Sequence, residues 1–161
     1  MATLTHFDEQ GASRMVDISN KEITDRIAVA QAKVIMKPET FRLIMDKKIQ
    51  KGDVLEVARV AGIMAAKQTF SLIPMCHPLN LASVKIDYTN NSVDTIDVFS
   101  EVRVSGKTGV EMEAITAAAI CAITIYDMCK SLDKEMIISD MHLVRKSGGK
   151  SGTFAFGKNH A

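Results

Sequence analysis

The chain has 161 residues, a length that fits one domain with a hydrophobic core of its own. Lysine and arginine total 20 and aspartate and glutamate total 19, so overall charge favours neither nucleic acid nor a membrane as partner. Three cysteines without framework spacing are typical of a reducing compartment, and we expect a cytoplasmic protein. The N-terminus lacks a signal-peptide pattern, and the most apolar run, 114–126, is too short to span a bilayer and predicts a buried core helix.

The first third of the chain predicts an arm, a strand and two helices. Residues 1–13 are polar and unpatterned, which indicates a mobile arm. Side chains alternate between two faces in residues 26–36, which predicts a strand. A proline opens helical spacing over residues 38–48. After a glycine, Asp53 and Glu56 form a capping-box-like start to a second helix.

The middle of the chain predicts a rigid loop and a hairpin. Two prolines at the ends of residues 74–78 exclude a helix there and favour an extended loop. Residues 84–88 and 96–104 each alternate apolar with polar side chains, and the Asn-Asn-Ser at 90–92 is turn chemistry. The two segments are therefore predicted to be antiparallel neighbours.

The last third predicts one long helix and a final strand. The helix is expected at 109–131 and the strand at 137–143, followed by a glycine-, serine- and lysine-rich loop and a flexible tail at 155–161. The order of elements matches the βαββαβ arrangement of ferredoxin-like α+β domains, with an antiparallel sheet and helices on one face. We therefore expect a single domain at 14–154. The fold alone does not specify a function.

Two segments imitate a phosphate-binding loop, at residues 106–108 and 149–151. A true loop of that class needs a glycine five residues before the first glycine, where this chain has Glu101 and Val144. Both matches therefore fail. The C-terminal loop still combines glycines with cations and suits a phosphate, although a solvated tail explains its composition equally well. Its basic residues are Arg145, Lys146 and Lys150.

Acidic residues near both ends of the long helix are candidates for chemistry. Thr108 and Glu111 fit a capping box, which gives Glu111 a structural explanation. Glu113 and Asp127 fall within about 40° of each other around the helix, on a face predicted to look inward, with Lys130 at its edge. Charged side chains on a buried face favour function over the alternative of a structural Asp127–Lys130 ion pair.

The helix is too long for both carboxylates to reach one reacting atom. Fourteen residues of helix span about 21 Å. Either the ligand is long or a neighbouring chain brings its own helix end alongside, and the second solution is simpler. The spacing therefore predicts a site shared between subunits.

Two further side chains suit chemistry by their position. His77, between Cys76 and Pro78 on the rigid loop, is placed to exchange a proton near neutral pH, although an ordinary loop histidine is an alternative. A metal site at this histidine is poorly supported, because no second Cys/His pair lies at ligand spacing. Lys51 precedes a predicted helix start, a natural anion position, although alone it would look like a surface lysine.

Several strings together resemble the cyclic pyranopterin monophosphate synthases, the C proteins of molybdenum cofactor biosynthesis. The resemblance extends from about Leu4 to Phe154. It is carried by the strings at 15–19 (MVDIS), 51–53 (KGD), 61–63 (AGI), 73–79 (IPMCHPL), 106–114 (GKTGVEMEA), 124–130 (TIYDMCK) and 146–152 (KSGGKSG).

The resemblance implies a lyase that converts 3′,8-cyclo-7,8-dihydro-GTP into cyclic pyranopterin monophosphate and pyrophosphate. It also implies a ferredoxin-like fold and a hexamer, built as a trimer of dimers, with pockets between subunits. By the matching motifs, Asp127 is the catalytic aspartate and Lys51 and Lys130 are pocket lysines. The implied substrate-binding segments are Met75, Cys76 and His77 with Met112 and Glu113. We also count their neighbour Glu111 as a candidate substrate-binding residue.

The implied reaction consists of proton transfers and one phosphoryl displacement, so we expect no required cofactor. Our hypothesis makes Asp127 and Lys130 an acid–base pair and Lys51 a second proton donor. Glu113 and His77 would hold the guanine-derived ring, while three cations would bind the triphosphate: Lys146, Lys150 and Arg26. Magnesium is an optional aid to the phosphate step, but the sequence shows no carboxylate cage for it.

Two other classes of function compete with this hypothesis. A regulatory small-molecule-binding domain of the same fold would bind ligand without releasing pyrophosphate. An RNA-binding domain would need aromatic residues on the sheet and a basic face, whereas aromatic residues are 5% of this chain and its net charge is +1. We therefore expect neither nucleic acid nor membrane as a partner.

Overall fold

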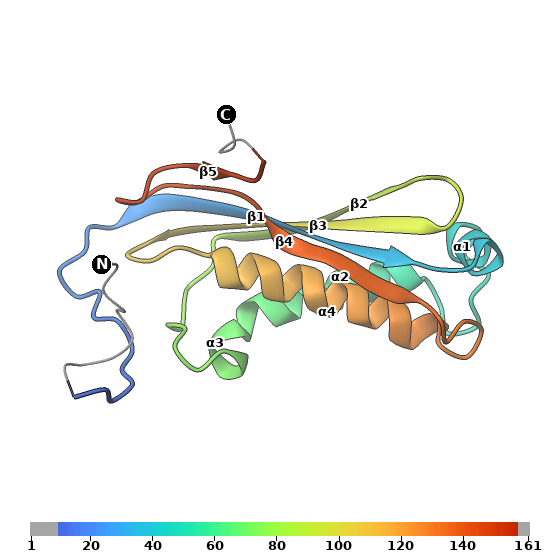
Figure 1. Cartoon of the computed structure of the whole chain (residues 1–161), viewed down its shortest axis with the longest axis horizontal. Coiled ribbons are helices and arrows are strands. Elements are labelled where there is room, and N and C mark those ends of the chain that lie inside the picture. The colour runs from blue at the N-terminus through green and yellow to red at the C-terminus, as the bar shows by residue number, and fades with distance from the viewer. Residues whose placement is uncertain (1–9, 158–161) are drawn as a thin grey trace.

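A computed structural model describes residues 10–157 as a five-stranded antiparallel sheet with two long helices on one face (Figure 1). The strand order is β2-β3-β1-β4-β5, and its first four strands have the ferredoxin-like order, as predicted. The strands are β1 (Thr24–Ile35), β2 (Ser83–Asn90), β3 (Thr95–Gly106), β4 (Ile137–Ser147) and β5 (Phe154–Ala155). The helices are α1 (Pro38–Met45), α2 (Val54–Lys67), α3 (Thr69–Leu72) and α4 (Glu111–Cys129).

The central strand β1 is lined by small side chains where it meets the helices. Ala28, Ala30, Ala32 and Val34 alternate along one face and are fully buried. Small side chains here let α4 lie close to the sheet, and Ile125 of α4 is buried in the same core. Complete burial of an isoleucine side chain stabilises the fold by about 1.5–3 kcal/mol. The alternation that predicted this strand is therefore its core-facing pattern.

Helix α2 packs tightly on α4 because of one glycine. A Cβ added at Gly62 would lie 2.9 Å from the Ala117 carbonyl oxygen, so a larger side chain would push the two helices apart. The predicted start of α2 is confirmed, because the Asp53 carboxylate accepts a hydrogen bond from the Glu56 backbone N–H at 3.3 Å. Together α2 and α4 cover the sheet and fix the long helix that carries the predicted site.

Helix α4 is long and apolar enough to cross a membrane by length and composition, yet 56% of that stretch is buried inside the protein. Its inner side chains pack on β1, β3 and α2. The prediction of a buried core helix is confirmed.

Several element boundaries differ from the predicted ones. The short helix α3 was not predicted, and α1 ends at Met45 rather than at residue 48. Strand β4 continues to Ser147, because its residues after 143 pair with β1 and then with β5. Much of the predicted arm and tail (1–9 and 158–161) lies outside the described residues. Strand β5 was not predicted, and it includes Ala155, the first residue of the predicted tail.

Candidate active site

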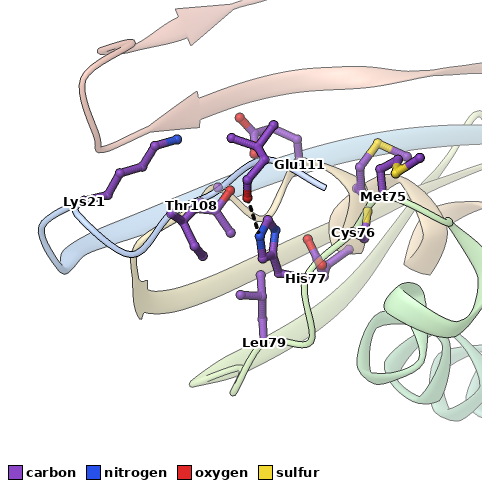
Figure 2. Close-up of a pocket in the computed structure, with 12 residues that line it drawn as sticks. Lys21, Met75, Cys76, His77, Leu79, Thr108 and Glu111 are labelled. Carbon is purple, nitrogen blue, oxygen red and sulfur yellow. Dashed lines mark hydrogen bonds between the residues drawn. The ribbon is translucent and has the colours of Figure 1, made fainter. Parts of the chain in front are cut away.

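A pocket of about 290 Å³ lies at the N-terminal end of α4 (Figure 2). Its walls come from the loop after α3, from the start of α4, and from the N-terminal segment 16–21, which we call the strap. The structure brings together six residues predicted to bind substrate: Met75, Cys76, His77, Glu111, Met112 and Glu113. The rest of the lining was not predicted as part of a site: Val16, Ile18, Lys21, Leu79, Thr108 and Gly109. We call this the inner pocket.

Glu113 is the buried acid of the inner pocket, with 4% of the residue exposed. Burial raises the pKa of this carboxyl group, and the nearby Glu111 raises it further. The side chain accepts a hydrogen bond from its own backbone N–H. The prediction that Glu113 faces inward is confirmed, and such a group is well suited to the paired N–H donors of a guanidine-like ring edge.

His77 connects the rigid loop to the strap. Its Nε2 lies 2.8 Å from the carbonyl oxygen of Val16 (Figure 2, dashed line). A carbonyl only accepts, so Nε2 carries a hydrogen and Nδ1 is left for a ligand. The strap is also held by Lys107, whose Nζ donates to the Ser19 carbonyl at 2.7 Å. These contacts place Lys21 at the pocket, which no local pattern in the sequence could indicate.

A second, cationic pocket of about 540 Å³ adjoins the inner one. We call it the outer pocket. Its cations come from three separate segments of the chain. Of the three cations predicted to bind the triphosphate, Arg26 and Lys150 line this pocket, and Lys146 does not. The lining is Lys21, Glu22, Thr24, Arg26, Lys107, Thr108, Gly109, Glu111, Gly149, Lys150 and Ser151.

The glycine-rich loop shapes the outer pocket around Arg26. The Arg26 Nε donates to the Gly106 carbonyl at 2.9 Å, which holds the guanidinium at the pocket. Gly149 has φ +74, and a Cβ there would collide with that guanidinium. The loop therefore packs directly against the arginine, which favours an anion site over a solvated tail.

Glu111 does not cap α4, so the predicted capping box is wrong. The N-cap residue is Val110, and no side chain caps the helix. The Glu111 carboxylate instead accepts from Lys146 Nζ at 2.7 Å, and the same nitrogen donates to the Ser151 hydroxyl at 3.0 Å. The strand β4, longer than predicted, brings this lysine to the helix start, and a charged partner there outcompetes the local cap.

The three predicted catalytic residues meet at the other end of α4. Lys130 Nζ contacts the Asp127 carboxylate at 2.6 Å, and Lys51 Nζ donates to the Asp127 backbone carbonyl at 2.9 Å. The Lys130 ammonium lowers the pKa of Asp127, with a smaller effect from Lys51, and Asp127 in turn raises the pKa of Lys130. The cluster thus offers one carboxylate acceptor beside ammonium donors. We call these residues the C-terminal cluster.

The prediction that Asp127 and Lys130 face inward is wrong. Their side chains are 57% and 52% exposed, and they form the ion pair that was the structural alternative. The buried stripe of α4 runs through Cys121 and Ile125, so Glu113 lies at its edge and Asp127 beyond it. At Glu113, the loop after α3 lies over this edge of the helix. At Asp127, the same edge of the helix is open to solvent.

The C-terminal cluster and the inner pocket lie too far apart to act on one ligand atom within a single chain. Glu113 of the inner pocket and Asp127 of the C-terminal cluster are 14 residues apart on α4, which corresponds to about 21 Å along the helix axis. Within residues 10–157 no group of three or more His, Cys, Asp or Glu side chains could hold a metal ion.

Replacing Glu113 with glutamine should stabilise the fold at neutral pH while weakening ligand binding. A carboxyl whose pKa is raised by folding opposes folding as pH rises above its ordinary value of 4.5. Glutamine has no charge to lose water on burial, so Glu113→Gln should raise the free energy of unfolding at pH 7, in proportion to the pKa shift that it removes. Denaturant titrations at several pH values measure this, and the gain should vanish below pH 4.5. The exposed Glu39 gives the control variant, Glu39→Gln.

The fold is a ferredoxin-like α+β domain, and its paired pockets combine a buried carboxylate with a cluster of cations, as in a protein that acts on small molecules. Comparison with known proteins then gives the family. Residues 15–149 match the model of the MoaC family. A cyclic pyranopterin monophosphate synthase of Desulfatibacillum aliphaticivorans is 56% identical over 96% of this chain and 98% of its own. The enzyme of that name from Syntrophomonas wolfei is 58% identical over 92% of this chain and 95% of its own. The chain belongs to the MoaC family.

Proposed function

We propose that this protein is a cyclic pyranopterin monophosphate synthase, a phosphorus–oxygen lyase that works in molybdenum cofactor biosynthesis. Its substrate would be 3′,8-cyclo-7,8-dihydro-GTP, and its products cyclic pyranopterin monophosphate and pyrophosphate. The observation that carries this proposal is the contiguous pair of pockets, one with a buried carboxylate and the other with several cations. The names of the relatives support it.

The inner pocket would hold the guanine-derived ring. Glu113 would accept the paired N–H groups of the ring edge, and the free Nδ1 of His77 would meet another polar ring atom. Met75 and Met112 would pack on the ring faces. In the outer pocket, Arg26 and Lys150 would bind the triphosphate and stabilise the charge on the leaving pyrophosphate. Lys146, which contacts Glu111 and Ser151 of the pocket wall, would join them.

The chemistry of ring opening and closure would depend on the C-terminal cluster of a neighbouring subunit. Asp127 would accept a proton, while Lys130 and Lys51 would donate protons. A complete site therefore needs two chains, and a hexamer built as a trimer of dimers would supply them. Because the Asp127 and Lys130 side chains are exposed, an adjoining subunit is the simplest completion of the site.

The reaction needs no electron carrier, and we expect no required cofactor. Magnesium would be an optional aid to the phosphate step through the substrate's own oxygens. We expect the enzyme to act in the cytoplasm on a small molecule, without nucleic acid or membrane.

The direct test incubates the purified protein with enzymatically prepared 3′,8-cyclo-7,8-dihydro-GTP. We expect equal amounts of pyrophosphate and of a pterin that becomes fluorescent on oxidation. Tight binding of the substrate with neither product would refute the enzyme and favour a binding-only domain.

Replacing Lys150 with alanine should mainly weaken substrate binding. A hydrogen bond to a charged group contributes about 1.5–3 kcal/mol, so affinity should fall at least about tenfold. The loss should shrink at high salt, because screening weakens the wild-type contact. Titration calorimetry with inorganic pyrophosphate at low and high ionic strength measures it. The exposed lysine variant Lys85→Ala is the control. A loss of rate at unchanged affinity would contradict the assignment.

A further inference from the structure

Glu111 stands at the junction of the inner and outer pockets. Four residues line both pockets: Lys21, Thr108, Gly109 and Glu111. Within the described part of the chain, Glu111 is the one carboxylate among them, since Glu113 lines only the inner pocket and Glu22 only the outer one. A ligand that fills both pockets must pass this carboxylate.

The junction corresponds to a definite part of the substrate. With the ring in the inner pocket and the terminal phosphates in the outer one, the sugar-derived hydroxyls and the α-phosphate lie between them. This placement rests on the proposed function. The group nearest Glu111 is therefore the one that must close the cyclic phosphate.

Lys146 places a cation beside Glu111. Its Nζ lies 2.7 Å from the Glu111 carboxylate and 3.0 Å from the Ser151 hydroxyl, so it stands between the helix start and the phosphate loop. An incoming phosphate oxygen competes with the carboxylate for this ammonium group. When Lys146 turns to the α-phosphate, the Glu111 carboxylate becomes available as a proton acceptor.

We infer that Glu111 is the general base of the phosphate-closing step. Glu111 takes the proton of the substrate hydroxyl as that oxygen attacks the α-phosphorus. A new phosphorus–oxygen bond forms, and the bond from the α-phosphorus to the oxygen that bridges it to the β-phosphorus breaks. The electron pair leaves with pyrophosphate, whose charge the outer-pocket cations Arg26 and Lys150 stabilise. The step consumes no other reactant.

Gly109 provides the space in which this carboxylate lies. A Cβ added at Gly109 would collide with the Glu111 carboxylate group. The backbone of Gly109 is not in the left-handed region, so an alanine there is unstrained and its effect is purely steric. The glycine is thus a means of displacing Glu111 without altering any charge.

The decisive experiment compares Glu111→Gln with the wild-type enzyme. We expect pyrophosphate release to fall by at least about 100-fold, the usual contribution of a general base. Binding of inorganic pyrophosphate should not weaken, because every cation remains. Glu111→Asp should recover part of the rate, and Gly109→Ala should lower it although all ionisable groups are present. The control is Glu101→Gln, which removes a carboxylate of similar exposure held by Arg103 and Arg145 on the sheet.

The outcomes separate this inference from the proposed function. If the wild-type protein makes neither pyrophosphate nor pterin, the proposed function fails. If it makes both and Glu111→Gln releases pyrophosphate within about tenfold of its rate, the assignment of Glu111 is overturned. Equal weakening of pyrophosphate binding and rate would also overturn it, because Glu111 would then only shape the site. Should Glu111→Gln not fold, Glu111→Asp and Gly109→Ala decide the question by the same two measurements.

Discussion

Replacing Asp127 with alanine should lower turnover by at least about 100-fold, the contribution expected of a proton-transferring group. The side chain is exposed and forms a surface ion pair with Lys130, so the fold loses little when it is removed. Lys51 should keep its place, because it binds the backbone carbonyl of residue 127 rather than the carboxylate. Steady-state pyrophosphate release measures the effect.

A matched variant separates chemistry from surface charge. Asp87 is 55% exposed and pairs with Lys85 at 2.7 Å, much as Asp127 pairs with Lys130. Asp87→Ala should leave turnover unchanged, and both variants should unfold at nearly the same denaturant concentration. Near-normal turnover by the Asp127 variant would show that this carboxylate has no catalytic role.

A mixture of two inactive variants should regain activity if sites are shared between subunits. Asp127→Ala keeps an intact inner pocket, and Glu113→Ala keeps an intact C-terminal cluster. Random assembly then gives one site in four with both halves intact, so roughly a quarter of wild-type activity should return. Co-expression with two affinity tags, followed by tandem purification and a pyrophosphate assay, measures this.

The same experiment has an internal control. Mixing Asp127→Ala with Lys130→Ala should restore nothing, because both changes lie in the same cluster and every site then lacks one of them. Tandem-purified mixed oligomers of Asp127→Ala and Glu113→Ala that remain inactive would contradict the two-chain site and favour an extended ligand within one chain.

The sequence alone determined the order of the main elements and the fold class. Alternation in β1, β2 and β3 is visible because one face of each strand is buried and the other is not. A proline begins the first helix at residue 38, and two prolines bound the loop at 74–78. The cap at Asp53 was also predictable, since it involves two residues three positions apart. Local patterns of this kind need no knowledge of distant neighbours.

Only the tertiary structure decided which charges meet. Thr108 and Glu111 fit a local cap, but β4 places Lys146 against Glu111 from 35 residues away, and that contact prevails. The strap enters the pocket through His77 and Lys107, which lie far from it in sequence.

The long helix predicted at 109–131 shows both what a local sequence pattern determines and what long-range packing determines. Its helical period and apolar composition were sufficient to predict a buried helix with Glu113 turned inward. Asp127, only about 40° away around the same helix, is exposed, because burial at the edge of a helix depends on what covers it. The loop after α3 faces Glu113 across the inner pocket, whereas the Asp127 side chain is 57% exposed. That difference arises from long-range packing, which helical periodicity does not encode.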